Sequence, residues 1–150
     1  MSRLSEVITR HPLFDSLSSH QLKELEPYLL IRNFKNGETI QKEGVKSHYI
    51  SYILTGEVKA SKLNASGKAV TVRVLKEKSI LCGGCNGLGY VTILTARALG
   101  EVELLCLSED SLKLLEDKYP RIALKVYKAI LSFTFNVLHQ ISSEISNRNE

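Results

Sequence analysis

The N-terminal end of this chain carries hydrophobic residues at helical spacing. Apolar positions recur on one side over residues 2–10, and Pro12 limits that helix because the residue before a proline is driven out of the helical region. Ser18 and Gln21 have the spacing of a capping box, in which each side chain hydrogen-bonds the backbone N–H of the other residue. The pattern therefore predicts two helices, over residues 2–10 and 19–28.

The middle of the chain alternates apolar and polar positions in short runs that turn residues separate. Asn36-Gly37 predicts a tight turn, and Asn64 to Gly67 predicts a hairpin loop. The three valines of residues 70–75 share one face. The expected strands are 31–34, 38–41, 49–54, 57–63, 70–75, 79–81, 91–99 and 102–108. The predicted fold class is α+β: an eight-stranded antiparallel β-roll, a jelly-roll-like barrel, with N-terminal helices and a long C-terminal helix.

The C-terminal part of the chain returns to a helical period. Residues 109–118 predict a short helix, and Pro120 fits the first turn of a longer one over 121–147. Such a helix extends about 40 Å, which is long for one small barrel to cover, so we expect a homodimer through this helix. The alternative is a helix folded flat on its own barrel. The expected dimer contacts are Val126, Ile130, Phe133, Val137 and Ile141.

Length and composition limit the class of protein. At 150 residues we predict a single domain over 1–150, divided into N-terminal helices (1–30), a β-roll (31–108) and C-terminal helices (109–148), with no DNA-binding domain. The net charge of +4 includes no block of like charges, which argues against nucleic-acid binding by this chain. No apolar run approaches the roughly 18 residues of a membrane span, and the N-terminus lacks the core of a signal peptide. We therefore expect a cytoplasmic protein with no membrane contact.

A glycine-rich stretch over residues 79–99 is the strongest candidate site. Its glycines allow positive φ angles or close approach of the backbone, and loops of this kind cradle phosphates with backbone N–H groups. Tyr90 has a ring that can stack on a base, although a tyrosine at the start of a strand is more often half-buried packing. The candidate ligand-binding residues are Leu81, Gly83, Gly84, Asn86, Gly87, Tyr90 and Thr92.

Cys82 and Cys85 form a C-x-x-C pair inside the same stretch. Such a pair is typical of a redox dithiol or of half a metal site. Cys106 is the only other cysteine and the four histidines are scattered, so we predict no metal site. The simpler interpretation is that the two cysteines are reduced thiols packed in a tight loop, and a thiol redox switch is the alternative. The chain has no nucleophile–base motif, so we predict no catalytic residues and no enzymatic activity.

The order of helix, β-roll, short helix and long helix resembles that of the cyclic-nucleotide-binding domains. These include the regulatory domains of the catabolite activator family, of cyclic-nucleotide-dependent kinases and of gated channels. Four segments carry the resemblance: HPLFDSL at 11–17, GETIQKEG at 37–44, YISYILTGEV at 49–58 and ELLCLS at 103–108. The resemblance implies a non-enzymatic regulatory module whose C-terminal helices shift relative to the loop when a ligand binds.

The phosphate-binding cassette departs from the family pattern. Members that bind cyclic AMP or GMP usually carry F-G-E and, a few residues later, R-x-A. The resemblance assigns the glutamate to the ribose 2′-hydroxyl and the arginine to the cyclic phosphate. Here Leu81-Cys82-Gly83-Gly84 stands at F-G-E, and no acid occurs from residue 79 to 97. Thr92 falls near the arginine position, and Arg97 comes about five residues too late.

A buried phosphate without a cation partner carries a large desolvation cost. We therefore expect a regulatory or sensor module that binds neither cyclic AMP nor cyclic GMP in the usual way and requires no cofactor. One alternative is a module that binds a partner protein and no small molecule. Another is a redox switch at Cys82 and Cys85.

Overall fold

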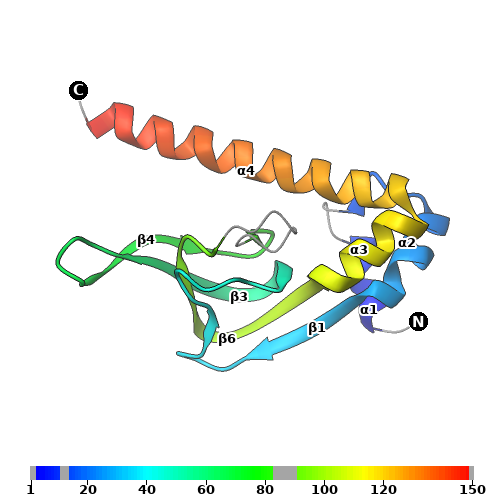
Figure 1. Ribbon diagram of the computed structural model, residues 1–150, viewed down its shortest axis with the longest axis horizontal. Helices are drawn as coiled ribbons and strands as arrows, with labels where there is room; N and C mark the ends of the chain where they lie inside the picture. The colour runs from blue at the N-terminus through cyan, green and yellow to red at the C-terminus, as the bar shows by residue number, and fades with distance from the viewer. Residues whose placement is uncertain (1–2, 11–13, 83–90, 149–150) are drawn as a thin grey trace.

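The computed structural model describes residues 3–10, 14–82 and 91–148. Helices gather at one end of the molecule and strands at the other, and the long helix α4 (Pro120–Arg148) runs past both (Figure 1). The N-terminal helices are α1 (Arg3–Arg10), α2 (Ser19–Leu25) and the short 3-10 helix η2 (Glu26–Tyr28). No helix in the described part of the chain is both long enough and apolar enough to span a membrane.

The capping box at the start of α2 is confirmed. The N–H of Gln21 donates to Ser18 Oγ (3.1 Å), and the N–H of Ser18 donates to Gln21 Oε1 (3.0 Å). Two backbone donors that a helix start leaves without partners are thereby satisfied, and this pins α2 to begin at Ser19.

The strands form one antiparallel sheet that curls into a roll (Figure 1). They are β1 (Leu29–Phe34), β2 (Thr39–Gln41), β3 (Tyr49–Leu63), β4 (Ala69–Leu75), β5 (Ile80–Cys82) and β6 (Thr95–Ser108). The order is β1-β6-β3-β4, with β2 paired to β6 and β5 paired to β3. The predicted α+β class, an antiparallel roll with N-terminal helices and a long C-terminal helix, is confirmed.

Two of the predicted strand breaks are wrong. The chain continues through Gly56 within β3 and through Gly100 within β6, so the described residues form six strands where eight were expected. Residues 100–102 lie opposite Gly56 alone, which is a bulge that bends the sheet without ending it. Gly56 has φ +92°, and a Cβ there would lie 2.3 Å from the carbonyl oxygen of Glu101. Only glycine therefore lets the two strands approach this closely.

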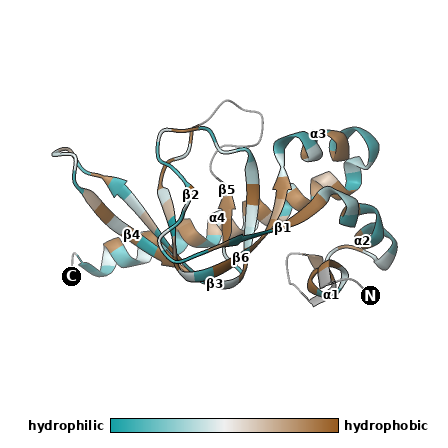
Figure 2. Cartoon of the chain, turned by 90° about the horizontal axis from the view of Figure 1, so that it is seen from below, coloured by the Kyte–Doolittle hydropathy of each residue, from teal (hydrophilic) through white to brown (hydrophobic). Residues whose placement is uncertain are grey.

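Alternation along β3 and β6 sends side chains into two cores. One core lies between the sheet and the helices, where hydrophobic segments of both meet (Figure 2). The other fills the inside of the roll. From these two strands the first core takes Ile50, Tyr52, Leu54, Leu105 and Leu107, and the second takes Ile53, Val58, Ala96, Ala98, Val102, Leu104 and Cys106.

The two C-terminal helices follow the sequence pattern closely. α3 (Glu109–Lys118) has the predicted bounds, and Ser108 caps it by accepting a hydrogen bond from the N–H of Ser111 (3.0 Å). α4 begins at Pro120, whose missing N–H costs nothing at a first helical turn. Ile122 and Ala123 are 2% and 3% exposed, and no later residue of α4 is fully buried. α4 is therefore anchored in the core by its first turn.

Candidate functional site

The described part of the glycine-rich stretch begins with β5. Leu81 pairs with Ser51 of β3 and is 5% exposed in the core inside the roll. A leucine in that place offers a ligand only an apolar contact. The other candidates in the loop lie outside the described residues, and their ligand-binding role stays a prediction: Gly83, Gly84, Asn86, Gly87 and Tyr90.

Thr92 stands near the position where the family resemblance places an arginine. Thr92 is 1% exposed. Its N–H donates to the carbonyl of Val45 (3.1 Å), and its carbonyl accepts from the N–H of Gly44 (2.8 Å). A neutral side chain in this buried place supplies no positive charge to a phosphate.

Glu43 precedes Gly44 and Val45, the residues that bond Thr92, and forms hydrogen bonds with β3 and β6. Its carboxylate accepts hydrogen bonds from the N–H of Leu63 (3.0 Å) and from Lys62 Nζ (3.1 Å), and its own N–H donates to Thr95 Oγ1 (3.0 Å). The backbone hydrogen bond from Leu63, and after it the bond from Lys62, lowers the pKa of Glu43. An ionised Glu43 thus holds the chain that enters β6 in a fixed place.

Arg97, the nearest arginine in sequence, is exposed. It pairs with Thr39 of β2 and Lys59 of β3, while its neighbours Ala96 and Ala98 face the inside of the roll. Alternation along β6 therefore turns Arg97 outward, and it offers no cation to the inside.

Arg73 of β4 is a cation that the sequence analysis missed. It lies opposite Ala60, as Leu75 lies opposite Val58, so Arg73 belongs to the inner face of the roll. Its Nη2 donates to Gln140 Oε1 on α4 (2.9 Å). Its Nη1 is buried and has no hydrogen-bond partner among the described residues. Such a buried donor is costly, and an anion beside it would remove the cost.

The alternation of β4 places Arg73 on the face opposite its three valines. They share one face, as expected, but at 47%, 48% and 44% exposure Val70, Val72 and Val74 face away from the roll. The opposite face, with Arg73 and Leu75, lies toward the inside. Hydropathy alone suggests that the valine face is buried, and only the register with β3 shows the reverse.

A second arginine, Arg32 of β1, lies beside the core of the roll, and its guanidinium group lies over two aromatic rings. Its guanidinium carbon is 4.3 Å from the centre of the Tyr49 ring and 4.9 Å from that of Phe34.

Cys106 Sγ, fully buried in the core inside the roll, is 3.3 Å from Ser51 Oγ. Burial raises the pKa of Cys106, opposed by hydrogen bonds from Ser51 and Arg32. The buried thiol therefore stays protonated and unreactive.

The C-x-x-C pair lies at the edge of the described residues. The side chain of Cys82 and the whole of Cys85 lie outside the described residues, so the redox hypothesis stays a prediction. Over the residues that the structure does describe, no three His, Cys, Asp or Glu side chains gather where they could hold a metal ion.

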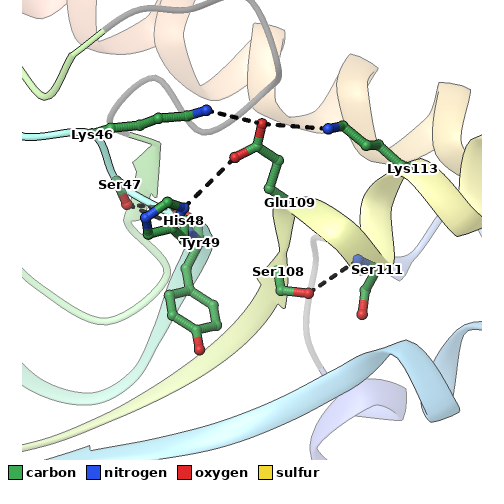
Figure 3. A network of polar contacts seen from close by, with 8 residues as sticks. All are labelled: Lys46, Ser47, His48, Tyr49, Ser108, Glu109, Ser111 and Lys113. Atoms are coloured by element: carbon green, nitrogen blue, oxygen red, sulfur yellow. Dashed lines mark hydrogen bonds and ion pairs between the residues drawn. The ribbon is translucent and has the colours of Figure 1, made fainter.

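Glu109, the first residue of α3, ties the C-terminal helices to the segment between β2 and β3 (Figure 3). Lys46 Nζ lies 3.4 Å from Glu109 Oε1, Lys113 Nζ lies 3.9 Å from the same oxygen, and His48 Nδ1 lies 3.8 Å from Oε2. The N–H of Glu109 also donates to the carbonyl of His48 (2.9 Å). Residues 44–48 therefore contact Thr92 at one end and the start of α3 at the other.

Comparison with known proteins agrees with this architecture. The model of the cyclic nucleotide-binding domain matches residues 31–119. A solved cyclic nucleotide-binding domain from Methylobacillus flagellatus KT is 20% identical with a TM-score of 0.81, over 97% of this chain and 82% of that one. The catabolite activator protein of Thermus thermophilus is 18% identical with a TM-score of 0.73, over 92% of this chain and 63% of that one. No curated protein sequence matches.

A third solved structure shares the fold. It is the regulatory subunit of a cAMP-independent protein kinase A from Trypanosoma brucei, 15% identical with a TM-score of 0.71, over 92% of this chain and 52% of that one. That protein is a mutant with a threonine-to-arginine and a valine-to-alanine substitution among its changes, bound to cAMP in the A site. At these identities the similarities establish the fold alone.

Proposed function

Because this chain belongs to the cyclic nucleotide-binding domain family, we propose that it is a non-enzymatic regulatory module that does not bind cyclic AMP or cyclic GMP in the family's usual way. One observation carries the proposal. Thr92 is buried and neutral near the expected arginine position, and Arg97 faces outward, so neither pairs with a cyclic phosphate. At the position where the family resemblance places the arginine, the cost of burying a phosphate is then not offset, and Arg73 of the inner face is hydrogen-bonded to Gln140 on α4.

The module acts through its C-terminal helices. In support, Thr92 contacts Gly44 and Val45 through backbone hydrogen bonds, and Lys46 and His48 of the same segment contact Glu109 at the start of α3. A change at Thr92 therefore reaches α3 through five consecutive residues, 44–48. This short route makes α3 and α4 the elements whose position reports the state of the roll.

The test of this proposal is calorimetric titration with cyclic AMP and cyclic GMP, of the natural chain and of Thr92→Arg. We expect no saturable binding by the natural chain up to millimolar nucleotide. In T92R a guanidinium can meet the cyclic phosphate, and a charge-assisted contact of about 1.5–3 kcal/mol corresponds to an affinity gain of about 10- to 100-fold. The Trypanosoma brucei mutant, which gained an arginine at a threonine, motivates the choice.

Arg97→Gln is the matched control, because it removes a nearby but outward-facing arginine and should change nothing. Circular dichroism first establishes that T92R is folded. Micromolar binding of either nucleotide by the natural chain would overturn the proposal, and so would natural-chain binding that R97Q abolishes.

The proposed module forms a homodimer through α4. Val126, Ile130 and Phe133, three of the five expected contacts, pack on the chain's own core, and Val137 and Ile141 are half-buried. A different stripe is left exposed at intervals of seven: Leu124, Leu131, Leu138 and Ile145 at 53%, 69%, 59% and 52%, with Phe135 at 68%. This is the seven-residue spacing of one of the two seam positions of a coiled coil, and a second copy of α4 would cover it.

A second candidate function is a partner-binding module without a small-molecule ligand. It is favoured by Val70, Val72 and Val74, which form an exposed apolar face on β4, the last strand in the described sheet order. The titration separates the two candidates, because a module with no ligand pocket would bind no nucleotide even as T92R. A cytoplasmic location and a role in signal transduction belong to both proposals.

A further inference from the structure

A cleft of about 590 Å³ lies between α4, the turn that precedes β5 and the segment that precedes α2. Its volume is within the range of small-molecule sites, about 300–1,000 Å³. The apolar junction next to it, where Ile50 and Leu105 meet α4, leaves only about 30 Å³. That is about a tenth of the smallest volume typical of a small-molecule site. Of these two spaces, only the cleft can admit a ligand.

The cleft carries excess positive charge. Lys78, Lys125 and Lys128 line it, against the single carboxylate of Asp15. Ser132 on α4 adds a hydroxyl to the same wall. Glu77, whose charge also acts on Tyr52 in this wall, adds a second carboxylate, and the positive charge that remains in excess favours an anion.

The three lysines have different tasks. Lys125 Nζ donates to the carbonyl of Ser16 (2.6 Å) and to Gln21 Oε1 (2.9 Å), so it holds the segment before α2 against α4. The ammonium groups of Lys78 and Lys128 have no hydrogen-bond or ion-pair partner within residues 3–10, 14–82 and 91–148. These two cations remain for a ligand.

Lys78 has a backbone conformation that lysine rarely adopts. Its φ is +74°, and it is the one residue other than glycine with a positive φ in the described chain. Its N–H donates to the carbonyl of Ile53 (3.0 Å), and the N–H of Ile53 donates to the carbonyl of Ser79 (3.0 Å), so the turn is held on both sides. Glycine would occupy this place without strain, and a lysine there indicates that the side chain has a use.

Tyr52 forms part of the same wall and is 4% exposed. Burial, and after it the charges of Asp15 and Glu77, raises the pKa of Tyr52 to about 12. The phenol is therefore neutral at physiological pH and does not add negative charge to the cleft.

We propose that this cleft binds a small molecule with a phosphate or polyphosphate group, held between Lys78 of the roll and Lys128 of α4. The site is separate from the inside of the roll and does not depend on whether that inside takes a nucleotide. A ligand that bridges the two lysines joins α4 to the roll through the cleft, so its binding would oppose movement of α4.

Inorganic pyrophosphate is the probe, titrated by calorimetry into the natural chain at low ionic strength. We expect saturable binding that weakens about tenfold in Lys78→Gly and in Lys128→Gln, since each removes one charge-assisted contact. K78G relieves the positive φ, so its melting temperature should be no lower than that of the natural chain. A loss of affinity in K78G thus cannot come from unfolding.

The double variant Lys42→Gln, Lys68→Gln is the matched control, because it removes two exposed lysines that do not line the cleft. It should bind pyrophosphate as the natural chain does. Equal weakening in this control would mean general attraction of anions and would overturn the proposal. No saturable binding at millimolar pyrophosphate would also overturn it. The gain in nucleotide binding from the natural chain to T92R tests the roll, because Lys78 and Lys128 are the same in both chains, so the two proposals fail independently.

Discussion

The two halves of α4 differ in how the domain holds them. The first turn buries Ile122 and Ala123 in the core between the sheet and the helices. In the second half no residue is fully buried, and a hydrogen bond that Arg73 Nη2 donates to Gln140 Oε1 joins the helix to the roll. A helix fixed at its base and lightly attached further on can move its far end at small cost. This difference makes α4 suitable for transmitting the state of the roll.

The same helix also divides its apolar residues between two faces. Residues such as Val126 and Phe133 pack on the domain, while Leu131 and Leu138 stay exposed at a spacing of seven. The first face stabilises the fold, and the second is the face through which we propose the dimer. Substitutions on the two faces should therefore separate stability from assembly.

The largest expected effect is at the base. Ile122→Ala removes a fully buried side chain and should lower the free energy of unfolding by about 2–5 kcal/mol. Ile145→Ala, an exposed position near the far end, should change it by less than about 0.5 kcal/mol. Urea denaturation followed by circular dichroism measures both at a protein concentration where the chain is monomeric. Similar losses in the two variants would contradict the anchored-base interpretation.

The next effect concerns assembly. We expect light scattering to give a mass near twice the 16.8 kDa of one chain, and Leu131→Glu, Leu138→Glu to weaken the dimer about 100-fold or more, because it buries carboxylates in the seam. Ser143→Glu, Asn147→Glu adds the same charge outside the stripe and should leave the dimer intact. A natural chain of 16.8 kDa at micromolar concentration would contradict the dimer.

A third effect is a pH dependence at the junction below α4. Tyr52 has a pKa of about 12 in the fold and, as an ordinary phenol, about 10 when unfolded. The unfolded chain therefore loses this proton first, so the contribution to stability is complete below about pH 10 and is lost as the pH rises toward 12. Tyr52→Phe should lack this part of the alkaline loss. Melting temperatures from pH 9 to 12 that fall equally in both chains, within about 1 °C, would contradict it.

The smallest effect is at the far attachment. Gln140→Ala removes the acceptor of Arg73 Nη2, so that this nitrogen joins Nη1 in having no hydrogen-bond partner among the described residues, and should cost about 1 kcal/mol. Arg73→Met removes the buried donors themselves, leaves only the exposed Gln140 amide without its contact, and should cost less, or stabilise the protein. The order of the two urea midpoints is the measurement. A greater loss in R73M than in Q140A would mean that the arginine already has another acceptor.

Much of this architecture could be predicted because its signals are local. The capping box at Ser18 and the bounds of α3 depend on residues within one or two turns, and both are confirmed. The strand breaks at Gly56 and Gly100 were wrong because a glycine ends a strand or forms a bulge depending on what lies across the sheet. That information is not local.

The candidate site divides in the same way. The family pattern, the absence of an acid from residue 79 to 97 and the placing of Thr92 near the arginine position could all be read from the order of the residues. Two other features depend on the folded chain: the valines of β4 face outward with Arg73 turned inward, and Lys78 and Lys128, 50 positions apart, line one cleft. The physical reason is that strand register and helix docking bring distant residues together. Neither strand register nor helix docking can be read from the spacing of apolar residues along the sequence.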